Sequence, residues 1–466
     1  MNVIDSMELL LQGAKILSIV EGNGIRVDVD AMEEEIRRTE SEINRLEEKI
    51  RKDVIYSYWE KRFGEKTNIG SRDQLRDVLF LDMDFKPLSF TPSGKPQLDT
   101  TTLMSIDLPI LRVFQRTESL KKLLATSFGG LKKELHNGFV HPFYNLHTAR
   151  TYRSSSDRFN FQNIPVRNPD LAGRIRRCFV PRKGNRLVEV DYSAIEVRIA
   201  SCYNLDPNLI QYVEDTDRDM HRDSAADLLK CDPQQVSKKL RYYAKNQFVF
   251  PQFYGSYYAE CAANLWESFQ GCGEEIDGDP VLKWLEQRGI HSRGDCDPER
   301  DPVSGTFESH VRAVERHFWQ NRFPVYSRWK DRWYASYQEK GYVDTLTGFR
   351  IQGELGRNDV INYPIQGSAF HCLLWSLIRL QKELRRRKME SRIVGQIHDS
   401  ILGDVPDREL QEYLYLVQDV SCRQIRKEWE WIVVPLAVEA EITPVDGNWH
   451  QKEEWVDKDG RWRPVT

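Results

Sequence analysis

Leu187-Val-Glu-Val-Asp-Tyr-Ser-Ala-Ile-Glu-Val-Arg198 is the stretch of sequence that decides the fold. Its apolar, β-branched beginning is typical of a strand, and this strand ends in Asp191. A helix-like segment with Glu196 and Arg198 follows. A carboxylate at a strand end can bind Mg²⁺, which prefers oxygen ligands, and the carbonyl of Tyr192 is a candidate further ligand. Taken alone, an aspartate at a surface turn is the simpler interpretation.

A second acidic site lies in Gln396-Ile-His-Asp-Ser400, between two apolar runs. This pattern predicts a hairpin with His398 and Asp399 at its bend. One aspartate on each of two adjacent strands can hold two metal ions, which together stabilise the attacking and leaving oxygens of a phosphoryl transfer. An aspartate in a hairpin bend is common, so this signal is also weak alone.

A third candidate is the basic segment Arg241-Tyr-Tyr-Ala-Lys245, which is followed by Phe248, Phe250 and Tyr254. Arg241 and Lys245 are four residues apart and therefore share one face of a helix. Two cations followed by aromatic side chains suit a triphosphate with its sugar and base. The alternative is a basic surface helix that packs its aromatic residues inward.

Length and composition limit the class of protein. A chain of 466 residues predicts two to four structural units. The net charge of −4 means that a nucleic-acid surface would depend on local clusters of basic residues. The eight cysteines form no C-x-x-C pair, which favours reduced thiols and a cytoplasmic location. Cys272, His291 and Cys296 lack a fourth ligand for zinc. No run of about 18 apolar residues is present, so no membrane span is expected.

The apolar pattern predicts helices first and a sheet later. An apolar stripe on a long charged helix near the N-terminus suits an antiparallel helical pair; it consists of Met32, Ile36, Ile43, Leu46 and Ile50. Four β-branched runs predict a small antiparallel sheet interrupted by a large helical insertion: Leu187–Tyr192, Arg392–Ile397, Ser400–Val405 and Val433–Ile442. Residues 270–306 are rich in Gly, Asp and Pro and predict a loop excursion within the insertion.

The three candidate sites resemble the A, B and C motifs of family A DNA polymerases, the family of bacterial DNA polymerase I and many phage replicases. The resemblance covers about residues 9 to 449 in the family's order. Its further motifs are Asn68–Leu75, Thr151–Ser156, Asn160–Pro165, Asp219–His221, Gly348–Arg350, Asn362–Ser368, Pro435–Glu439 and Trp449.

This resemblance implies an α+β right-hand polymerase fold, with a palm built on a small antiparallel sheet, helical fingers and a helical thumb. The implied division is a segment leading into the palm (1–30), the thumb (31–135), the palm with motif A (136–198), the fingers with motif B (199–390, with the insertion at 270–306) and the palm with motif C (391–466).

The resemblance also implies roles for the residues of the three motifs. Asp191, Asp399 and the Tyr192 carbonyl would bind two Mg²⁺ ions, for which Mn²⁺ can substitute. His221, Arg241 and Lys245 would hold the dNTP, with Lys245 protonating the leaving pyrophosphate. Glu196 would exclude a ribose 2′-hydroxyl, and Tyr254 would hydrogen-bond Glu196.

A further set of residues would contact the DNA: Arg153, Asn160, Asn163, Arg198, Gln366, Gln396 and His398. Hydrogen-bond donors of this kind can test the shape of a base pair without reading its sequence. This is possible because purine N3 and pyrimidine O2 occupy similar places in the minor groove.

Four departures separate the sequence from the family pattern. Ala194 replaces a glutamine, Ser400 replaces an acidic residue, and Tyr152 replaces a glycine. The spacing from Lys245 to Tyr254 is one residue longer than in the family. Counting back from Tyr254 makes Phe250 the aromatic residue that stacks on the nucleotide, whereas helical phase favours Phe248. We choose Phe250, because a π-bulge would reconcile the register.

The expected partners are primer-template DNA and dNTPs, in phage or bacterial replication, with the chain acting as a monomer. The thumb-like sequence begins near Met1, so a 3′–5′ exonuclease would be a separate polypeptide or would have been truncated away. A single-subunit RNA polymerase is an alternative, against which Glu196 argues. A repair polymerase and an inactive DNA-binding scaffold are the others.

Overall fold

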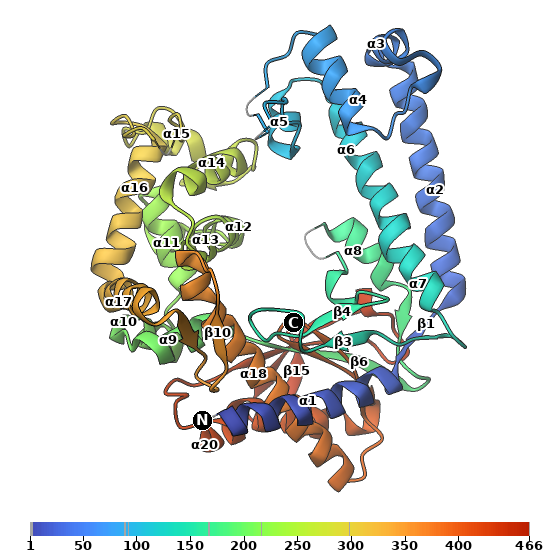
Figure 1. Cartoon of the computed structure of the whole chain (residues 1–466), viewed down its shortest axis with the longest axis vertical. Coiled ribbons are helices and arrows are strands. Elements are labelled where there is room, and N and C mark those ends of the chain that lie inside the picture. Colours follow the sequence, from blue (N-terminus) through green and yellow to red (C-terminus); the bar gives the residue numbers. More distant parts are fainter. Residues whose placement is uncertain are drawn as a thin grey trace.

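The computed structural model describes residues 3–87, 90–91, 93–165, 168–215, 217–297 and 299–465. Two helical arms rise from a base that contains the largest sheet (Figure 1). Helix α1 (Val3–Asn23) runs along this base. Among the described residues, no helix combines the length and the apolar character needed to cross a bilayer.

The sheet of the base has six antiparallel strands. Their spatial order is β11 (Arg392–Ile397), β12 (Ser400–Pro406), β6 (Asn185–Tyr192), β13 (Val438–Ile442), β14 (Glu453–Lys458) and β15 (Arg461–Pro464). The predicted hairpin is confirmed, and motif A lies on the strand beside it. The helical insertion between β6 and β11 is also confirmed.

The last predicted strand is wrong at its beginning, because β13 starts at Val438 and not at Val433. Pro435 lies in the missing part; it has no N–H to donate to a ladder, and its carbonyl accepts a hydrogen bond from Arg198. The hairpin of β14 and β15 was not predicted. It extends the sheet on the far side of β13.

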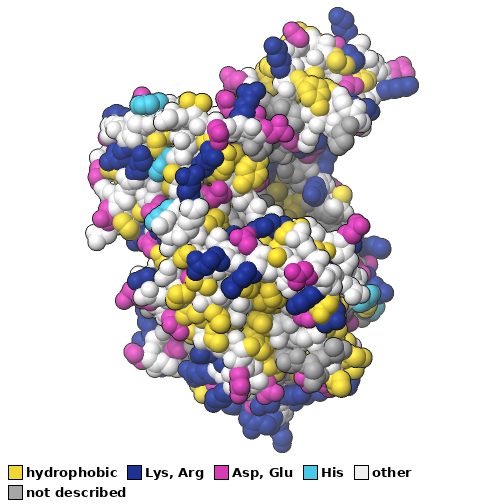
Figure 2. All heavy atoms as spheres, turned by 60° about the vertical axis from the view of Figure 1, so that its left-hand side comes forward, with side chains coloured by type: hydrophobic (Ala, Val, Ile, Leu, Met, Phe, Trp, Pro, Cys, Tyr) yellow, Lys and Arg dark blue, Asp and Glu magenta, His cyan; other side chains and the backbone are white. Residues whose placement is uncertain are grey.

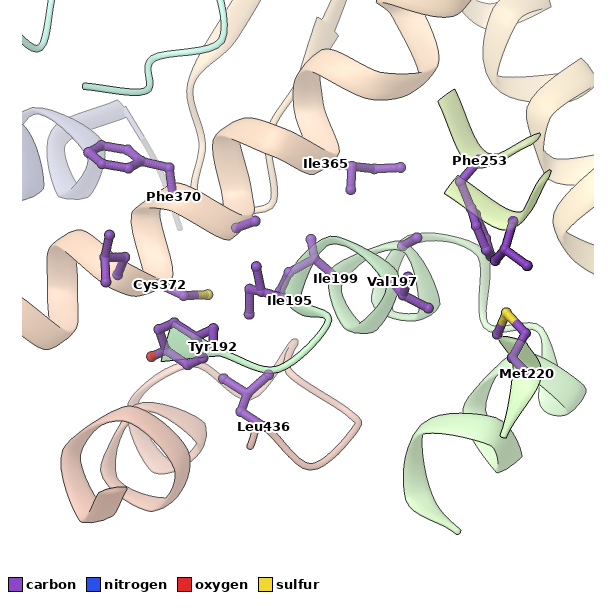
Figure 3. Packing of buried hydrophobic residues seen from close by; sticks show 14 of the residues in the cluster. Tyr192, Ile195, Val197, Ile199, Met220, Phe253, Ile365, Phe370, Cys372 and Leu436 are labelled. Atoms are coloured by element: carbon purple, nitrogen blue, oxygen red, sulfur yellow. The ribbon is translucent and has the colours of Figure 1, made fainter. Parts of the chain in front are cut away.

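Helix α18 (Arg357–Arg386) packs against the base and connects it to the second arm (Figure 1). Figure 3 shows Tyr192 of β6 and Ile195 of α9 (Ile195–Asn204) beside Cys372 of α18. The Tyr192 hydroxyl bonds the Ser376 hydroxyl of α18 at 2.9 Å. This buried contact fixes the end of β6, and therefore the position of Asp191, relative to α18.

The first arm is a helical pair with a helical tip (Figure 1). Four residues of the predicted stripe, Met32, Ile43, Leu46 and Ile50, are buried, which confirms the stripe. The arm consists of α2 (Val29–Lys52), α3 (Val54–Phe63), α4 (Arg72–Asp77), α5 (Thr100–Ser105), α6 (Pro109–Lys122) and α7 (Gly129–Glu134), with α8 (Pro169–Arg176) at its foot. Helices α2 and α6 pack along each other in opposite directions, as expected. The tip projects beyond the rest of the molecule in Figure 2.

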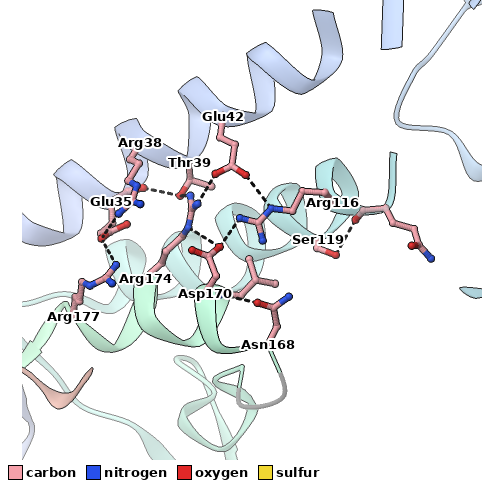
Figure 4. Close-up of polar contacts among 12 residues, drawn as sticks. Glu35, Arg38, Thr39, Glu42, Arg116, Ser119, Asn168, Asp170, Arg174 and Arg177 are labelled. Atoms are coloured by element: carbon pink, nitrogen blue, oxygen red, sulfur yellow. Dashed lines mark hydrogen bonds and ion pairs between the residues drawn. The ribbon is translucent and has the colours of Figure 1, made fainter. Parts of the chain in front are cut away.

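An ion-pair network joins the first arm to its foot (Figure 4). Arg174 of α8 is only 2% exposed and donates to Thr39 at 3.0 Å and to Glu42, both on α2. Arg116 of α6 donates to the same Glu42 at 2.9 Å and to Asp170 of α8. Three helices are therefore held together by two arginines and two carboxylates.

The second arm is mainly helical and includes α10 (Pro207–Glu214), α11 (Met220–Leu229), α12 (Lys238–Ala244), α13 (Phe250–Tyr254), α14 (Tyr258–Phe269), α16 (Phe307–His317) and α17 (Pro324–Lys340). The excursion at 270–306 is not entirely loop, because it forms β7 (Glu275–Ile276), β8 (Asp279–Pro280) and α15 (Val281–Glu286). Val281, Trp284 and Leu285 of this segment are buried in the arm's core. Among the described residues, no group of three or more His, Cys, Asp or Glu side chains is arranged to hold a metal.

Candidate active site

Asp191 and Asp399 lie together at one end of the central sheet. Asp191 is near the end of β6, where its register partners are Ser400 on one side and Glu439 on the other. Asp399 occupies the turn between β11 and β12, and its carbonyl accepts a hydrogen bond of 3.3 Å from the Tyr192 N–H. His398 adopts a left-handed conformation (φ 51°), which turns the chain tightly at this point. The hairpin thus brings two acids, 208 residues apart in sequence (399 − 191), to one place.

The two acids perturb each other. Burial, and then the neighbouring Asp399 carboxylate, hold the pKa of Asp191 well above its usual range. Burial also raises the pKa of Asp399, although a main-chain N–H and Arg153 oppose this effect. Within the described residues, Asp191 Oδ1 is buried and has no hydrogen-bond partner. Such a pair of hard oxygen donors, destabilised as anions and partly unsatisfied, fits divalent cations.

The side chain of Tyr192 cannot be part of this acidic site. It points into the core beside Cys372 and Leu436 (Figure 3). Its hydroxyl contacts Ser376 and the carbonyl of Ser421. Only the main-chain groups of Tyr192 remain next to the acids, which agrees with the prediction that its carbonyl, and not its ring, is the candidate ligand.

A pocket of about 370 Å³ opens beside Asp399. Motif A, motif B, α18 and the hairpin each contribute to its walls. Seven of its lining residues are predicted site residues: Arg153, Glu196, Phe250, Tyr254, Gln366, His398 and Asp399. The structure therefore gathers predicted residues from five separate sequence segments around one cavity.

Glu196 forms the centre of a polar contact in this pocket. The Tyr254 hydroxyl donates to Glu196 Oε2 at 2.7 Å, which confirms the predicted hydrogen bond. Arg153 donates to the other carboxylate oxygen, Oε1, at 3.2 Å. Both oxygens of Glu196 are thus occupied, and its carboxylate is held in one position at the wall of the pocket.

His221, Arg241, Lys245 and Phe250 form a second group, next to the pocket on the second arm. The Lys245 ammonium lies 5.2 Å from the centre of the Phe250 ring, and the His221 ring meets Phe250 edge-on at 5.5 Å. Burial, followed by the charges of Arg241 and Lys245, lowers the pKa of His221 to about 4. Among the described residues, His221 Nδ1 is buried without a partner. The group therefore presents fixed positive charge and an unsatisfied imidazole nitrogen.

The register of the aromatic residues is resolved by a π-helical turn. This turn, Lys245–Val249, separates α12 from α13 and absorbs the extra residue, as predicted. Phe248 is 0% exposed and packs edge-on against Phe318 in the core. Phe250 lines the pocket. The geometry thus agrees with the choice of Phe250 over Phe248.

Arg198 and Gln396 of the predicted DNA-binding set make hydrogen bonds within the protein. The Arg198 guanidinium donates to the carbonyls of Ser193, Val213 and Pro435, so that it ties motif A to its surroundings. Gln396 is 0% exposed. Its amide oxygen accepts hydrogen bonds from Ser154 at 2.7 Å and Gln162 at 2.9 Å, and its amide nitrogen donates to the His398 carbonyl at 2.6 Å. In this structure the polar groups of both side chains are engaged mainly by other groups of the protein.

Asn160 and Asn163 lie apart from the pocket on the short helix η4 (Phe161–Asn163) and are exposed. The Asn160 side chain caps this helix by accepting from the Asn163 N–H at 3.1 Å. Arg153, Gln366 and His398, in contrast, line the pocket itself.

Two contacts of the site were missed from sequence. Asp219 accepts from Arg241, and it also caps α11 through the His221 N–H. Asp219 was noted only as part of a motif, although an aspartate two residues before a histidine at a helix start signals a cap. Lys452 pairs with Glu189, two residues before Asp191, at 2.6 Å. The alternation of β6 places Glu189 and Asp191 on one face and could have indicated this contact.

The amino-acid sequence matches a known protein family. A family model described as DNA polymerase family A matches residues 29–276 and 312–451. The chain belongs to DNA polymerase family A. The segment between the two matched ranges contains most of the excursion at 270–306 that the sequence analysis singled out.

Individual relatives agree with this assignment. DNA polymerase I of Chloroflexus aurantiacus is 29% identical over 456 residues, covering 94% of this chain and 42% of the relative. The thermostable DNA polymerase I of Thermus thermophilus is 27% identical over 470 residues, covering 96% of this chain and 47% of the relative. The chain spans less than half the length of these curated relatives.

A solved structure confirms the fold. The POL domain of Pol1 from M. smegmatis, in complex with DNA primer-template and dNTP, superimposes with a TM-score of 0.73 at 24% sequence identity. The match covers 95% of this chain and 70% of that chain. The predicted α+β right-hand polymerase fold is thereby confirmed.

Proposed function

We propose that the chain is a template-directed DNA polymerase that adds dNTPs to a primer 3′-hydroxyl. The observation that carries this proposal is the paired Asp191 and Asp399 beside a pocket whose wall holds Glu196. Family membership supports the same conclusion. In this proposal the acid pair forms the reaction centre, and the pocket binds the nucleotide.

Asp191, Asp399 and the Tyr192 carbonyl would hold two Mg²⁺ ions, for which Mn²⁺ can substitute. When bound, such ions stabilise the attacking and leaving oxygens of an in-line phosphoryl transfer. The buried, unpaired Asp191 Oδ1 supports this assignment. The raised pKa values of both acids support it as well, since a bound cation would favour the carboxylates that burial disfavours.

Arg241, Lys245 and His221 bind the triphosphate of the incoming dNTP. Asp219 orients Arg241. Lys245 has no ion pair among the described residues, so its ammonium is available to protonate the leaving pyrophosphate. Phe250 stacks on the sugar and base. His221 donates a ring N–H to a phosphate oxygen; burial and the charges of Arg241 and Lys245 lower its pKa to about 4, and a bound triphosphate would oppose that shift.

Glu196 selects deoxynucleotides. Because Tyr254 and Arg153 hold both of its oxygens, its carboxylate cannot swing away to make room for a ribose 2′-hydroxyl. Tyr254 is itself 44% exposed, which suits a ring that alternates with a template base in one stack.

The DNA lies between the two arms in this proposal. Arg153, Gln366 and His398 contact the new base pairs from the pocket, and Asn160 and Asn163 contact the duplex further along. Residues 31–135 serve as the thumb, 136–198 and 391–466 as the palm, 199–390 as the fingers, and 1–30 lead into the palm. A replicative role in phage or bacteria is the setting we favour.

Primer extension tests the proposal. A labelled primer on a template of defined sequence is incubated with Mg²⁺ and either dNTPs or NTPs. We expect dNTP-dependent products whose sequence follows the template, with no products when Mg²⁺ is omitted. Equal use of NTPs would favour the RNA polymerase alternative. Binding of the primer-template without extension under any of these conditions would favour an inactive scaffold.

A further inference from the structure

One face of the central sheet carries a block of four carboxylates. Glu189 and Asp191 are two residues apart on β6 and therefore lie on the same face of the sheet. The register places Glu441 opposite Glu189 and Glu439 opposite Asp191. Like charges directly opposite each other on a sheet are destabilising. The block therefore requires positive charge close to it.

Lys452 supplies that charge at one end only. Its ammonium contacts Glu189 at 2.6 Å and also pairs with Glu441. Across the described residues, neither Asp191 nor Glu439 has an ion pair with lysine or arginine. Glu439 instead accepts a hydrogen bond of 2.7 Å from the Ser193 hydroxyl.

The other neighbour of Asp191 contributes no charge. Ser400 of β12 is its register partner, is 3% exposed, and donates its hydroxyl to the Ile397 carbonyl at 3.0 Å. Asp191 therefore has an uncharged neighbour on β12, Ser400, whose hydroxyl is already hydrogen-bonded. Its neighbour on β13, Glu439, is a carboxylate. Glu439 also contributes to raising the pKa of Asp191, after burial, Asp399 and Glu189.

We propose that Glu439 is a positioning residue of the metal centre, whose carboxylate, oriented by Ser193, strengthens cation binding at Asp191 through the hydration shell of the ion. This inference rests on the proposed function. The role is indirect, because no three acidic side chains converge as a direct ligand set in the described part of the chain. Ser400 on the hairpin stands where the family pattern has an acidic residue. Glu439 on β13 gives this chain a third acidic group in its place.

Manganese binding tests this role without measuring catalysis. The full chain, bound to a chain-terminated primer-template and the next dNTP, is titrated with Mn²⁺, and free Mn²⁺ is followed by electron paramagnetic resonance. Four proteins are compared: wild type, Glu439→Gln, Glu441→Gln and Asp191→Asn. Glu441→Gln is the matched control, because Glu441 lies on the same strand and face but is neutralised by Lys452.

We expect Glu439→Gln to weaken Mn²⁺ binding by roughly tenfold, as loss of an indirect metal contact does. Glu441→Gln should bind like wild type, and Asp191→Asn should lose the site. Equal affinity of Glu439→Gln and wild type, with loss in Asp191→Asn, would overturn the role of Glu439 and leave the proposed function intact. Wild-type affinity in Asp191→Asn would instead overturn the proposed function and this inference with it.

Discussion

The hydroxyl of Tyr254 and the carboxylate of Glu196 are joined by a hydrogen bond of 2.7 Å across the pocket, from the second arm to motif A. The residues are 58 positions apart in sequence. Burial, followed by the charge of Glu196, raises the pKa of Tyr254 above its usual range, so the phenol stays protonated as the donor. This contact makes the second arm part of the wall of the pocket that we propose to hold the nucleotide sugar.

The first prediction concerns sugar selection. Glu196→Ala should raise the kcat/KM for an NTP relative to the matching dNTP by roughly 100-fold, because the side chain that fills the 2′ position is gone. Tyr254→Phe should produce a smaller gain, since it removes the hydrogen bond and keeps Glu196. Single-nucleotide incorporation kinetics measure both ratios. An unchanged ratio in Glu196→Ala would contradict the role of Glu196.

Lys245 is expected to act in turnover and not in DNA binding. Lys245→Ala should lower kcat by about 10²- to 10⁴-fold, the range for loss of a positioned general acid. Its primer-template affinity should match that of the control variant Lys238→Ala. Lys238 is exposed and lies at the start of α12, further from Phe250 than Lys245 is. Rapid-quench kinetics and a DNA-binding titration give the two quantities. A parallel loss of DNA affinity in Lys245→Ala alone would make this lysine a contact to the phosphate backbone.

Phe248 and Phe250 should separate stability from nucleotide binding. Phe248→Ala removes a fully buried ring and should lower the free energy of unfolding by about 3–5 kcal/mol. Phe250→Ala should raise the KM for dNTP while changing stability far less. Urea unfolding and steady-state kinetics on the two variants test this. The reverse assignment of effects would show that the π-helical turn places Phe248 at the nucleotide.

The network at the foot of the first arm predicts a pH dependence. Burial alone would raise the pKa of Glu42, but Arg116 and Arg174 outweigh it and lower the pKa. A carboxylate with a lowered folded-state pKa adds stability that is present above its unfolded pKa and is lost as pH falls through the folded pKa. Glu42→Gln should therefore be less stable than wild type by about 1 kcal/mol at pH 7, allowing for its partial exposure.

That stability difference should shrink as pH falls below the ordinary glutamate pKa of about 4.3. Urea midpoints at pH 7 and in acid measure it, with Glu40→Gln as the control, because Glu40 is exposed on the same helix. A difference that stays constant over this range would mean that the ion pairs of Glu42 do not stabilise the arm.

DNA binding should depend on salt through the first arm. Arg112 and Lys122 line a groove of about 740 Å³ on this arm, and neither has an ion pair among the described residues. Lys122→Ala should reduce the slope of log Kd against log salt by about 0.9, the value for one phosphate contact. Lys52→Ala, which removes a lysine already paired with Glu48, should leave the slope unchanged. Equal slopes in all three proteins would place the duplex elsewhere.

Local patterns in the sequence were sufficient for much of this architecture. The hairpin at His398 and Asp399 and the apolar stripe of α2 follow from alternation and helical spacing, whereas the π-helical turn before Phe250 was inferred from a spacing one residue longer than the family's. The Tyr254–Glu196 contact came from the family resemblance, because no local rule joins two residues on different arms.

Features that depend on distant partners were not predictable in this way. Arg198 resembles a surface cation in sequence, but three carbonyls from separate segments surround it in the fold. Gln396 is saturated by Ser154 and Gln162, which only the packed base brings near. The β14–β15 hairpin was missed because most of its residues are polar or charged and its strands alternate weakly.

The pairing of Asp191 and Asp399 is the central claim, and single-turnover primer extension with Mg²⁺ tests it most directly. Asp191→Asn and Asp399→Asn keep the shape of each side chain and remove its charge. We predict that each variant loses extension by at least about 10³-fold while its primer-template affinity stays close to that of wild type. Extension near the wild-type rate in either variant would contradict the account.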